Sequence, residues 1–213
     1  MRGINSPPSK IPFMGKERNS TAWLDWLNKV YEKLRGPLWD DNTAELFNSA
    51  GGGVAPTLAA FGPTGITHQY EFNQGDSVEI AFHIKHDIKP GSYIYPHVHW
   101  STDGVGSGDV EWVLSYDVAK GHNQEAFSAG SSISVVQTAS GTAWQHMITE
   151  ASDAQAFIAP EIDSLIFMTV TRGSTSDTYP DTGTGGVFGL YVDLHYQKDR
   201  FGTPNKAPDF YAR

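Results

Sequence analysis

The feature that most constrains the fold is a series of short segments between residues 54 and 198 in which apolar and polar residues alternate. Successive side chains of a strand point to opposite faces of a sheet, so this alternation predicts strands with one buried face. Turn residues separate the segments at regular intervals. The predicted strands are Val54–Phe61, Thr67–Phe72, Val78–Ile88, Tyr93–Trp100, Val110–Ala119, Ser132–Thr138, Ala143–Glu150, Ser164–Thr171 and Gly186–Lys198.

Eight or nine strands without alternating helices favour an antiparallel sandwich or barrel. We expect an all-β fold, a jelly-roll-like antiparallel β-sandwich in which two four-stranded sheets pack face to face, with an N-terminal extended arm and one α-helix. An immunoglobulin-like sandwich is the alternative, although the chain of 213 residues has no cysteine pair and is long for that fold. Residues Ala151–Ile158 are predicted as a helical turn or a loop.

The N-terminal region differs from the rest of the chain. Residues 1–19 are rich in Pro, Ser, Lys and Gly and predict an extended basic arm, followed by a helix over Ser20–Leu34 that ends at Gly36-Pro37. Its apolar stripes run through Trp23, Leu27, Val30 and Leu34, and through Leu24, Leu27, Tyr31 and Leu34. A helix this short is not stable alone in water, so we expect it to cover the β body or to pack with its counterparts in an oligomer.

Four regions are predicted along the chain. They are the arm (residues 1–19), the helix with a Gly-rich linker (20–53, with 36–53 as a loop), the β-sandwich (54–198) and a C-terminal tail (199–213). The net charge of −9 is uneven, with +4 on residues 1–35, −15 on residues 36–196 and +2 on residues 197–213. An acidic body repels phosphate, so we expect no direct nucleic-acid binding. The basic ends predict either arms that dock onto acidic neighbours or solvated tails.

Several classes of protein are not expected from the sequence. No run approaches the ~18 consecutive apolar residues of a membrane span, and residues 1–16 lack the apolar segment of a secretory signal. The chain has no cysteine, which excludes disulfides, thiolate metal sites and cysteine nucleophiles and suits a reducing cytosol. The sequence motifs of serine hydrolases, zinc proteases and phosphate loops do not occur.

The His-x-His pair His97 and His99 is the strongest candidate for chemistry. Both residues lie on one face of a predicted strand, an arrangement that often holds a metal ion. Gly91, five residues and then His97-Val98-His99 resemble the first metal-binding motif of cupins, which are small jelly-roll barrels. Asp103 stands where that motif has a Glu, and the second cupin motif has no clear match.

Two residues of the last strand extend this candidate site. Asp193 and His195 share one strand face, so they form a cluster with His97 and His99 if the two strands are adjacent. The alternative is a half-buried packing face made of Tyr93, Tyr95, His97 and His99 that packs against a loop, the helix or a neighbouring subunit. Aromatic and histidine side chains suit subunit interfaces. We favour the packing face, and therefore predict no catalytic residue, no metal and no cofactor.

Two further binding sites are conceivable. Trp112, Trp144, Tyr179 and Tyr191 are candidates for a sugar-stacking surface, with core or interface packing as the alternative. Asp177 and Asp181 in the polar loop before the last strand are candidates for binding calcium, although this loop lacks an EF-hand pattern.

Several stretches of the chain resemble virion structural proteins of tailed bacteriophages and prophages. They are Phe188–Thr203, Pro96–Trp100, Glu111–Tyr116 and Ser164–Arg172, and the helix Ser20–Leu34 is similar to the entry segment of many phage particle proteins. The resemblance spans about residues 20–203. It implies a β-rich particle component in several copies, as a capsid decoration, neck or tail protein, and it brings no catalytic residues.

We therefore expect a non-enzymatic virion protein that is assembled in the host cytoplasm, acts as a homotrimer and docks through its terminal arm. Its expected partners are copies of itself and other phage structural proteins of the capsid, portal, neck or tail, with no nucleic acid and no membrane. The interface candidates are Trp23, Leu27, Val30, Leu34, Tyr93, Tyr95, His97 and His99. A cupin-like metal-dependent enzyme using His97 and His99, or a carbohydrate-binding module, is the alternative function.

Overall fold

The structure is a computed structural model that describes residues 21–35, 37–46, 53–104, 106–122, 124–181, 186–199 and 202–211. The chain divides into two compact units, residues 1–38 and 39–213. The first unit contains α1 (Thr21–Arg35), the single helix of the described residues, so the predicted helix is confirmed to within a residue at each end. This helix is neither long nor apolar enough to cross a membrane. The predicted arm at residues 1–19 lies outside the described residues.

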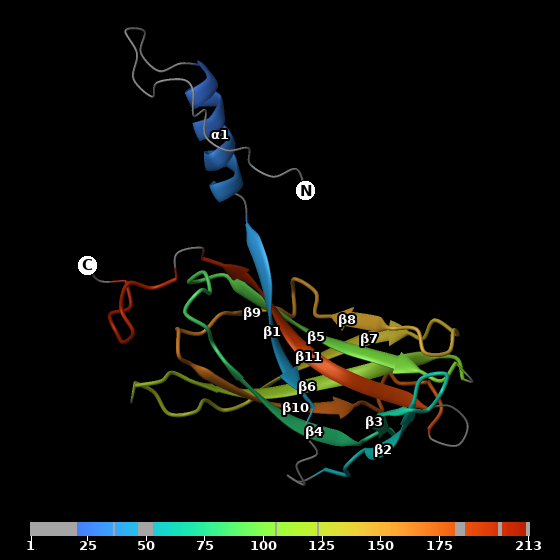
Figure 1. The fold of residues 1–213 in the computed structure, drawn as a ribbon. Helices are drawn as coiled ribbons and strands as arrows, with labels where there is room; N and C mark the ends of the chain where they lie inside the picture. The colour runs from blue at the N-terminus through green and yellow to red at the C-terminus, as the bar shows by residue number, and fades with distance from the viewer. Residues whose placement is uncertain are drawn as a thin grey trace, which may run out of the picture. The chain divides into compact units, whose positions relative to one another are not determined.

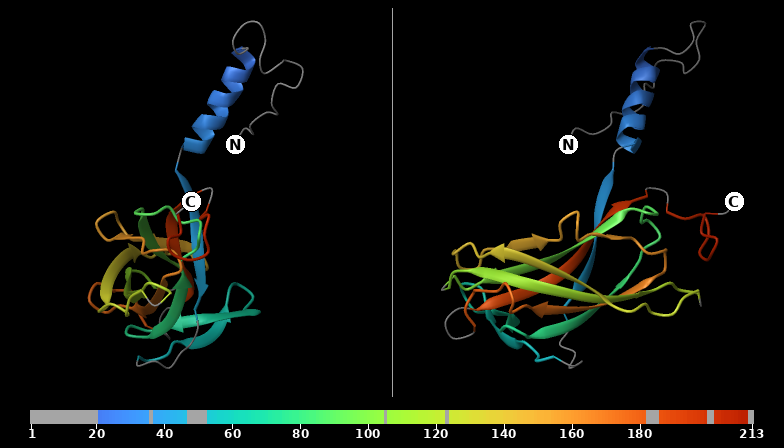
Figure 2. Two further views of the ribbon diagram at one scale, coloured as in Figure 1. Left: turned by 90° about the vertical axis from the view of Figure 1, so that its left-hand side faces the viewer. Right: turned by 180° about the vertical axis from the view of Figure 1, so that it is seen from behind.

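The second unit is a sandwich of two antiparallel sheets (Figure 1). One sheet has the order β2 (Thr57–Phe61), β3 (Thr67–Phe72), β11 (Val187–Lys198), β5 (Tyr93–Thr102), β8 (Met147–Glu150). In the same sheet β1 (Leu38–Glu45) pairs with β11, and β9 (Phe157–Ile158) pairs with β5. The other sheet has the order β4 (Ser77–His83), β10 (Leu165–Arg172), β6 (Asp109–Ala119), β7 (Ser131–Thr138). Figure 2 shows the two layers from two further sides.

Eight of these strands have the connectivity of a jelly roll. The orders β3-β11-β5-β8 and β4-β10-β6-β7 place strands that are consecutive in the chain in opposite sheets, except for the β6–β7 hairpin. This is the arrangement of two Greek keys folded into a double sheet. The predicted all-β sandwich is therefore confirmed, and β1, β2 and β9 are additions to it.

The core between the sheets follows from the alternation in the sequence. In β5, Ile94, Val98 and Trp100 are fully buried between the sheets, as their strand face predicts. From the opposite sheet, Trp112 of β6 packs edge-on against Trp100 with ring centroids 6.5 Å apart. The opposite face of β5 therefore carries the histidines.

Residues 38–45 form a strand where we predicted a loop. The sequence of β1 is mostly polar and alternates poorly, so the local pattern did not mark it as a strand, and its pairing with β11 does. Lys198 of β11 reaches Asp40 of β1 at 2.6 Å and Asp87 at 2.8 Å. The boundaries of other strands also move, and the strand predicted over Ala143–Glu150 shrinks to β8, because Trp144 has a positive φ of 62° in the preceding turn.

The described part of the C-terminal tail, residues 202–211, packs on the body. Phe210 is 3% exposed and its ring contacts the rings of His86 and His122 at centroid distances of 5.7 and 5.9 Å. The His86 Nδ1 atom is 2.6 Å from the Thr203 hydroxyl. This segment is therefore part of the folded unit.

Candidate functional site

The pairing of β5 with β11 brings the predicted histidine and carboxylate candidates together. In the antiparallel register His97 is directly opposite Asp193, and His99 is opposite Tyr191. Paired residues on neighbouring strands point to the same face, so Asp193 joins both histidines. The two strands run side by side in Figure 1.

A β-bulge sets which face of β11 carries these side chains. The register shifts between Gly189 and Tyr191, so Gly189 is opposite the inward-facing Trp100 while Tyr191 is opposite the outward-facing His99. One extra residue in one strand reverses the alternation beyond it. A side chain at Gly189 would place its Cβ 2.7 Å from the Phe72 ring, which explains why glycine stands there.

The ligand-type atoms of the cluster converge on one carboxylate oxygen. The Nε2 atoms of His97 and His99 lie 3.5 and 3.2 Å from Oδ2 of Asp193. The three residues each offer an atom within 4.8 Å of the others. They are buried, with exposed fractions of 5% for His97, 6% for His99 and 4% for Asp193.

Several buried polar atoms at this site have no hydrogen-bond partner among the described residues. They are Nδ1 of His97, Nε2 of His99 and Oδ1 of Asp193. The close approaches of His99 Nε2 and Asp193 Oδ2 are ion-pair distances without hydrogen-bond geometry. Because buried polar groups are nearly always satisfied, three such atoms in one cluster require an explanation.

A second layer of polar groups surrounds the two imidazoles. The Nδ1 atom of His99 is 2.7 Å from Nε2 of His146, and the Nδ1 atom of His97 is 3.7 Å from Oε2 of Glu150. The same Glu150 oxygen is 3.1 Å from Nδ1 of His195. The predicted candidate His195 therefore lies beside the buried cluster, through Glu150, and is itself partly exposed.

The cluster also receives residues from β1. The ring of Trp39 contacts the rings of Tyr95 and His195 at centroid distances of 5.8 and 5.0 Å. Ligand-type atoms of Asp41, His97 and His195 lie within 4.8 Å of one another. Sequence reasoning missed this contribution, because residues 36–53 were predicted as a loop.

The electrostatics of the site disfavour a protonated His99. Burial lowers the pKa of His99, the nearby His97 lowers it further, and the negative charge of Asp193 opposes both effects. Burial and the charge of Asp193 raise the pKa of the Tyr191 hydroxyl, whose ring stacks on His99 at a centroid distance of 4.1 Å. Neutral imidazole is the form of histidine that binds metals.

The predicted packing face is covered in part by the chain itself, by residues that were predicted as a loop. His97 and His99 are buried by their own chain, so they do not present a surface to a neighbouring subunit. Tyr93 is 50% exposed and Tyr95 is half-buried against Trp39, so these two of the four predicted residues remain accessible.

The predicted sugar-stacking surface does not form. Trp112 and Tyr179 are fully buried in the core. Trp144 packs against Phe61 and Phe188, and Tyr191 stacks on a histidine of the buried cluster. These aromatic side chains are therefore engaged within the body.

The predicted calcium ligands contact an arginine. Asp177 is buried and accepts hydrogen bonds from Nε and Nη2 of Arg172 at 3.0 and 2.8 Å. Asp181 lies 3.2 Å from Nη1 of the same Arg172. The guanidinium supplies the cation between these carboxylates, and it occupies the place that we expected for calcium.

A separate groove lies on the outer face of the four-stranded sheet. It has a volume of about 660 Å³, and its lining residues include Glu79, Asp117, Phe127, Phe167 and Thr169. Phe127 and Phe167 are 49% and 48% exposed, and their ring centroids are 5.2 Å apart. No motif in the sequence marked this groove, because strands β4, β6, β7 and β10 and the loop before β7 contribute one or a few residues each.

Comparisons with known proteins identify no family for this chain. No protein-family model matches the sequence, and a search of curated proteins finds no significant match. Solved structures with a similar fold include latent PorU from Porphyromonas gingivalis, with 10% identity, a TM-score of 0.33, and coverage of 75% of this chain and 13% of that chain. The enzymatically active domain of tailspike protein 4 of bacteriophage CBA120 has 11% identity, a TM-score of 0.32, and coverage of 78% and 20%.

A carbohydrate-binding module solved in complex with β-1,4-galactotriose, TmCBM61, has 13% identity and a TM-score of 0.24, with coverage of 76% of this chain and 92% of that chain. The chain thus spans a fifth or less of the first two structures. These similarities are limited to β-rich architecture, and TM-scores this low support no conclusion about function.

Proposed function

We propose that the chain is a structural component of a bacteriophage particle that assembles as a homotrimer through α1. The observation that carries this proposal is an apolar stripe on α1. Leu24, Leu27 and Tyr31 are 42%, 39% and 57% exposed, although they follow one another at spacings of 3 and 4 residues. This is the spacing with which helices pack in coiled coils.

The helix needs this packing in order to be stable. With 15 residues it is at the lower limit for an isolated helix in water, and it belongs to a unit separate from the sandwich. Equivalent helices of other copies present the same stripe, and a closed oligomer buries it. The resemblance to phage particle proteins implies several copies, and we propose three.

The charge distribution supports docking through the N-terminal region. The basic residues 1–35 and the strongly acidic residues 36–196 have opposite signs, so the two regions suit different neighbours. In this arrangement the N-terminal region attaches to an acidic surface of the capsid, neck or tail, and the jelly roll forms the displayed body. The double-sheet jelly roll is a frequent fold of viral particle proteins.

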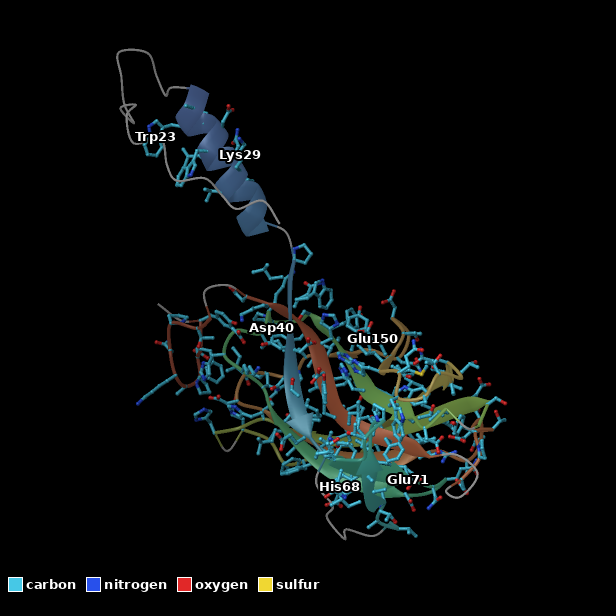
Figure 3. All side chains as sticks on the ribbon, turned by 45° about the vertical axis from the view of Figure 1, so that its right-hand side comes forward. Trp23, Lys29, Asp40, His68, Glu71 and Glu150 are labelled. Atoms are coloured by element: carbon cyan, nitrogen blue, oxygen red, sulfur yellow. The ribbon has the colours of Figure 1, made fainter. Side chains whose placement is uncertain are left out.

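Native mass spectrometry of the full chain tests the assembly. We expect a trimer for the wild type and a monomer for the double variant Leu24→Gln/Leu27→Gln, with an unchanged sandwich by circular dichroism. Lys29→Gln is the matched control, because Lys29 is exposed and projects from the other side of α1 than Trp23 (Figure 3). A monomeric wild type would contradict the proposed assembly.

The particle assignment has its own test. Mass spectrometry of purified particles of the phage that encodes the chain is expected to find it in several copies per particle. The Leu24→Gln/Leu27→Gln variant introduced into that phage should be depleted from the particles. Particles that lack the wild-type chain would overturn the assignment.

Glycan binding is a second candidate function, and the groove beside Phe127 and Phe167 favours it. Exposed aromatic rings offer stacking surfaces to sugar rings, while Glu79 and Asp117 offer acceptors for sugar hydroxyls. A glycan array probed with the wild type and Phe167→Ala tests this function. Binding should be lost in Phe167→Ala and kept in Val136→Ala, an exposed control on β7 that does not line the groove. An array without any binder counts against it.

A further inference from the structure

We propose that His97, His99 and Asp193 bind one divalent transition-metal ion of the zinc class, which joins β5 to β11. This site goes beyond the proposed structural function. Metal binding does not require assembly, and assembly does not require the metal. It rests on the convergence of the three side chains, on their burial and on their unpaired atoms.

The side chains converge because the backbone fixes them. His97 and His99 are two residues apart on one face of β5, and Asp193 lies opposite His97 in the register. The bulge at Gly189 turns Asp193 to this face. Strands hold such side chains more rigidly than loops do, as a metal site requires.

The unpaired atoms indicate what the cluster lacks. His99 Nε2 and Asp193 Oδ1 are buried without a hydrogen-bond partner in the described structure, and the neighbouring His97 Nε2 approaches Asp193 Oδ2 only at 3.5 Å. A metal ion between the two Nε2 atoms and the carboxylate satisfies lone pairs of all three groups. It also neutralises the buried negative charge of Asp193, which otherwise faces imidazoles.

The groups around the imidazoles complete the arrangement. Metal-binding histidines generally use one ring nitrogen for the metal and the other for a fixed partner. Here Nε2 of each histidine faces Asp193, while Nδ1 of His99 meets His146 and Nδ1 of His97 faces Glu150. His146 is therefore a positioning residue in this proposal, while Glu150 acts on His97 through its charge, because 3.7 Å is longer than a hydrogen bond.

The ligand set selects the class of metal. Two imidazole nitrogens and one carboxylate oxygen suit Zn²⁺ and similar first-row ions, whereas Mg²⁺ and Ca²⁺ prefer sites made of oxygen ligands. A mixed set of three protein ligands leaves a further coordination position. Asp41 of β1 is a candidate for that position, since its ligand atom lies within 4.8 Å of ligand-type atoms of His97 and His195.

The test uses the full chain, stripped of metal by a chelator and then titrated with Zn²⁺ or Co²⁺. We expect one Zn²⁺ per chain by elemental analysis, a higher melting temperature with Zn²⁺, and visible Co²⁺ absorption of a four- or five-coordinate site. Excess Mg²⁺ or Ca²⁺ should not displace the Zn²⁺. A wild type that binds no stoichiometric Zn²⁺ or Co²⁺ would overturn the proposal.

Variants locate the ion. His99→Ala and Asp193→Asn should lose the bound Zn²⁺ and the Co²⁺ absorption, and Glu150→Gln should weaken binding about 10- to 100-fold. His68→Ala is the matched control, because His68 is an exposed histidine on β3, far from Glu150 in the body (Figure 3). Circular dichroism checks that each variant is folded, and the wild-type Co²⁺ spectrum remains decisive where a variant is not.

A second histidine cluster is the main alternative binding site for the Zn²⁺ ion. His83, His86 and His122 each place Nε2 within 3.3 Å of the Asp163 carboxylate. Zn²⁺ that is kept by His99→Ala and Asp193→Asn but lost by His86→Ala would place the ion there and overturn the proposal. Zn²⁺ kept by His86→Ala and lost by the other two supports it.

Discussion

Arg172 and Asp177 form a two-point ion pair in which both side chains are fully buried. Nε and Nη2 of Arg172 donate to the two carboxylate oxygens at 3.0 and 2.8 Å, and Nη1 donates to the backbone carbonyl of Phe72 at 2.8 Å. Asp177 also accepts from the backbone N–H of Glu111. The pair thus ties the loop after β10 to β3 and β6.

Removing the arginine from this pair should be severely destabilising. Arg172→Met leaves the buried Asp177 without its cation, which costs about 3–5 kcal/mol of unfolding free energy. Urea unfolding at pH 7 measures the loss. The double variant Arg172→Met/Asp177→Leu should recover part of it, because it removes both charges of the pair. A double variant less stable than Arg172→Met would contradict this explanation.

Glu111 makes the stability of the sandwich dependent on pH. A hydrogen bond from the Ser134 hydroxyl is the largest cause that lowers the pKa of the buried Glu111, and the backbone N–H groups of Ser176 and Thr175 lower it further. A carboxyl group with a lowered pKa in the folded state stabilises the fold above its ordinary value of 4.5. This stabilisation is lost as the pH falls through the folded-state pKa.

Glu111→Gln should therefore cost about 1.5–3 kcal/mol at pH 7, since hydrogen bonds to a charged acceptor are the stronger ones. Below the ordinary pKa, the stability of the variant should fall less steeply with pH than that of the wild type. Urea unfolding across pH 3 to 7, about the titration range of carboxyl groups, measures both. Glu125→Gln, an exposed carboxyl variant, should keep the slope of the wild type.

The glycine at the bulge should not tolerate a side chain. In Gly189→Ala the Cβ meets the Phe72 ring at 2.7 Å and the Leu46 side chain at 3.0 Å, so the core must shift. We expect a loss of about 1–3 kcal/mol, as for other overpacked cores. Gly91→Ala is the control, because it has open space and carries only the strain of its φ of +70°. Thermal unfolding compares the two, and a larger loss in Gly91→Ala would be inconsistent with the packing argument.

The sequence predicts the sandwich well because burial alternates along its strands. Ile94, Val98 and Trp100 are buried in the core where the pattern places them, and His97 and His99 lie on the other face. The sequence predicts a cluster of His97, His99 and Asp193 only on the condition that their strands are adjacent. Alternation shows which face of a strand a residue lies on, but not which strands are neighbours. The pairing of β11 with β5 brings Asp193 opposite His97, and the bulge after Gly189 sets the face on which Asp193 lies.

The residues that sequence reasoning missed belong to parts with little apolar alternation. Asp41 lies on the polar strand β1, which resembles a loop in composition. His146 precedes the short strand β8, and its approach to His99 depends on the pairing of β8 with β5. Phe127 lies outside the strands and reaches Phe167 across the outer face of the sheet. Long-range pairing, rather than local pattern, creates each of these contacts.

High salt should affect the two contacts of the proposed assembly differently. The stripe of Leu24, Leu27 and Tyr31 is apolar, so the trimer should persist in about 1 M NaCl, where the Debye length falls to about 3 Å. Docking of the basic N-terminal region onto an acidic particle surface should weaken under the same conditions. Sedimentation of the free chain and of the chain with particles that lack it, at low and high salt, measures both. Docking that is unaffected by salt would remove the electrostatic role of the basic region, and a trimer that dissociates in salt would contradict the apolar seam.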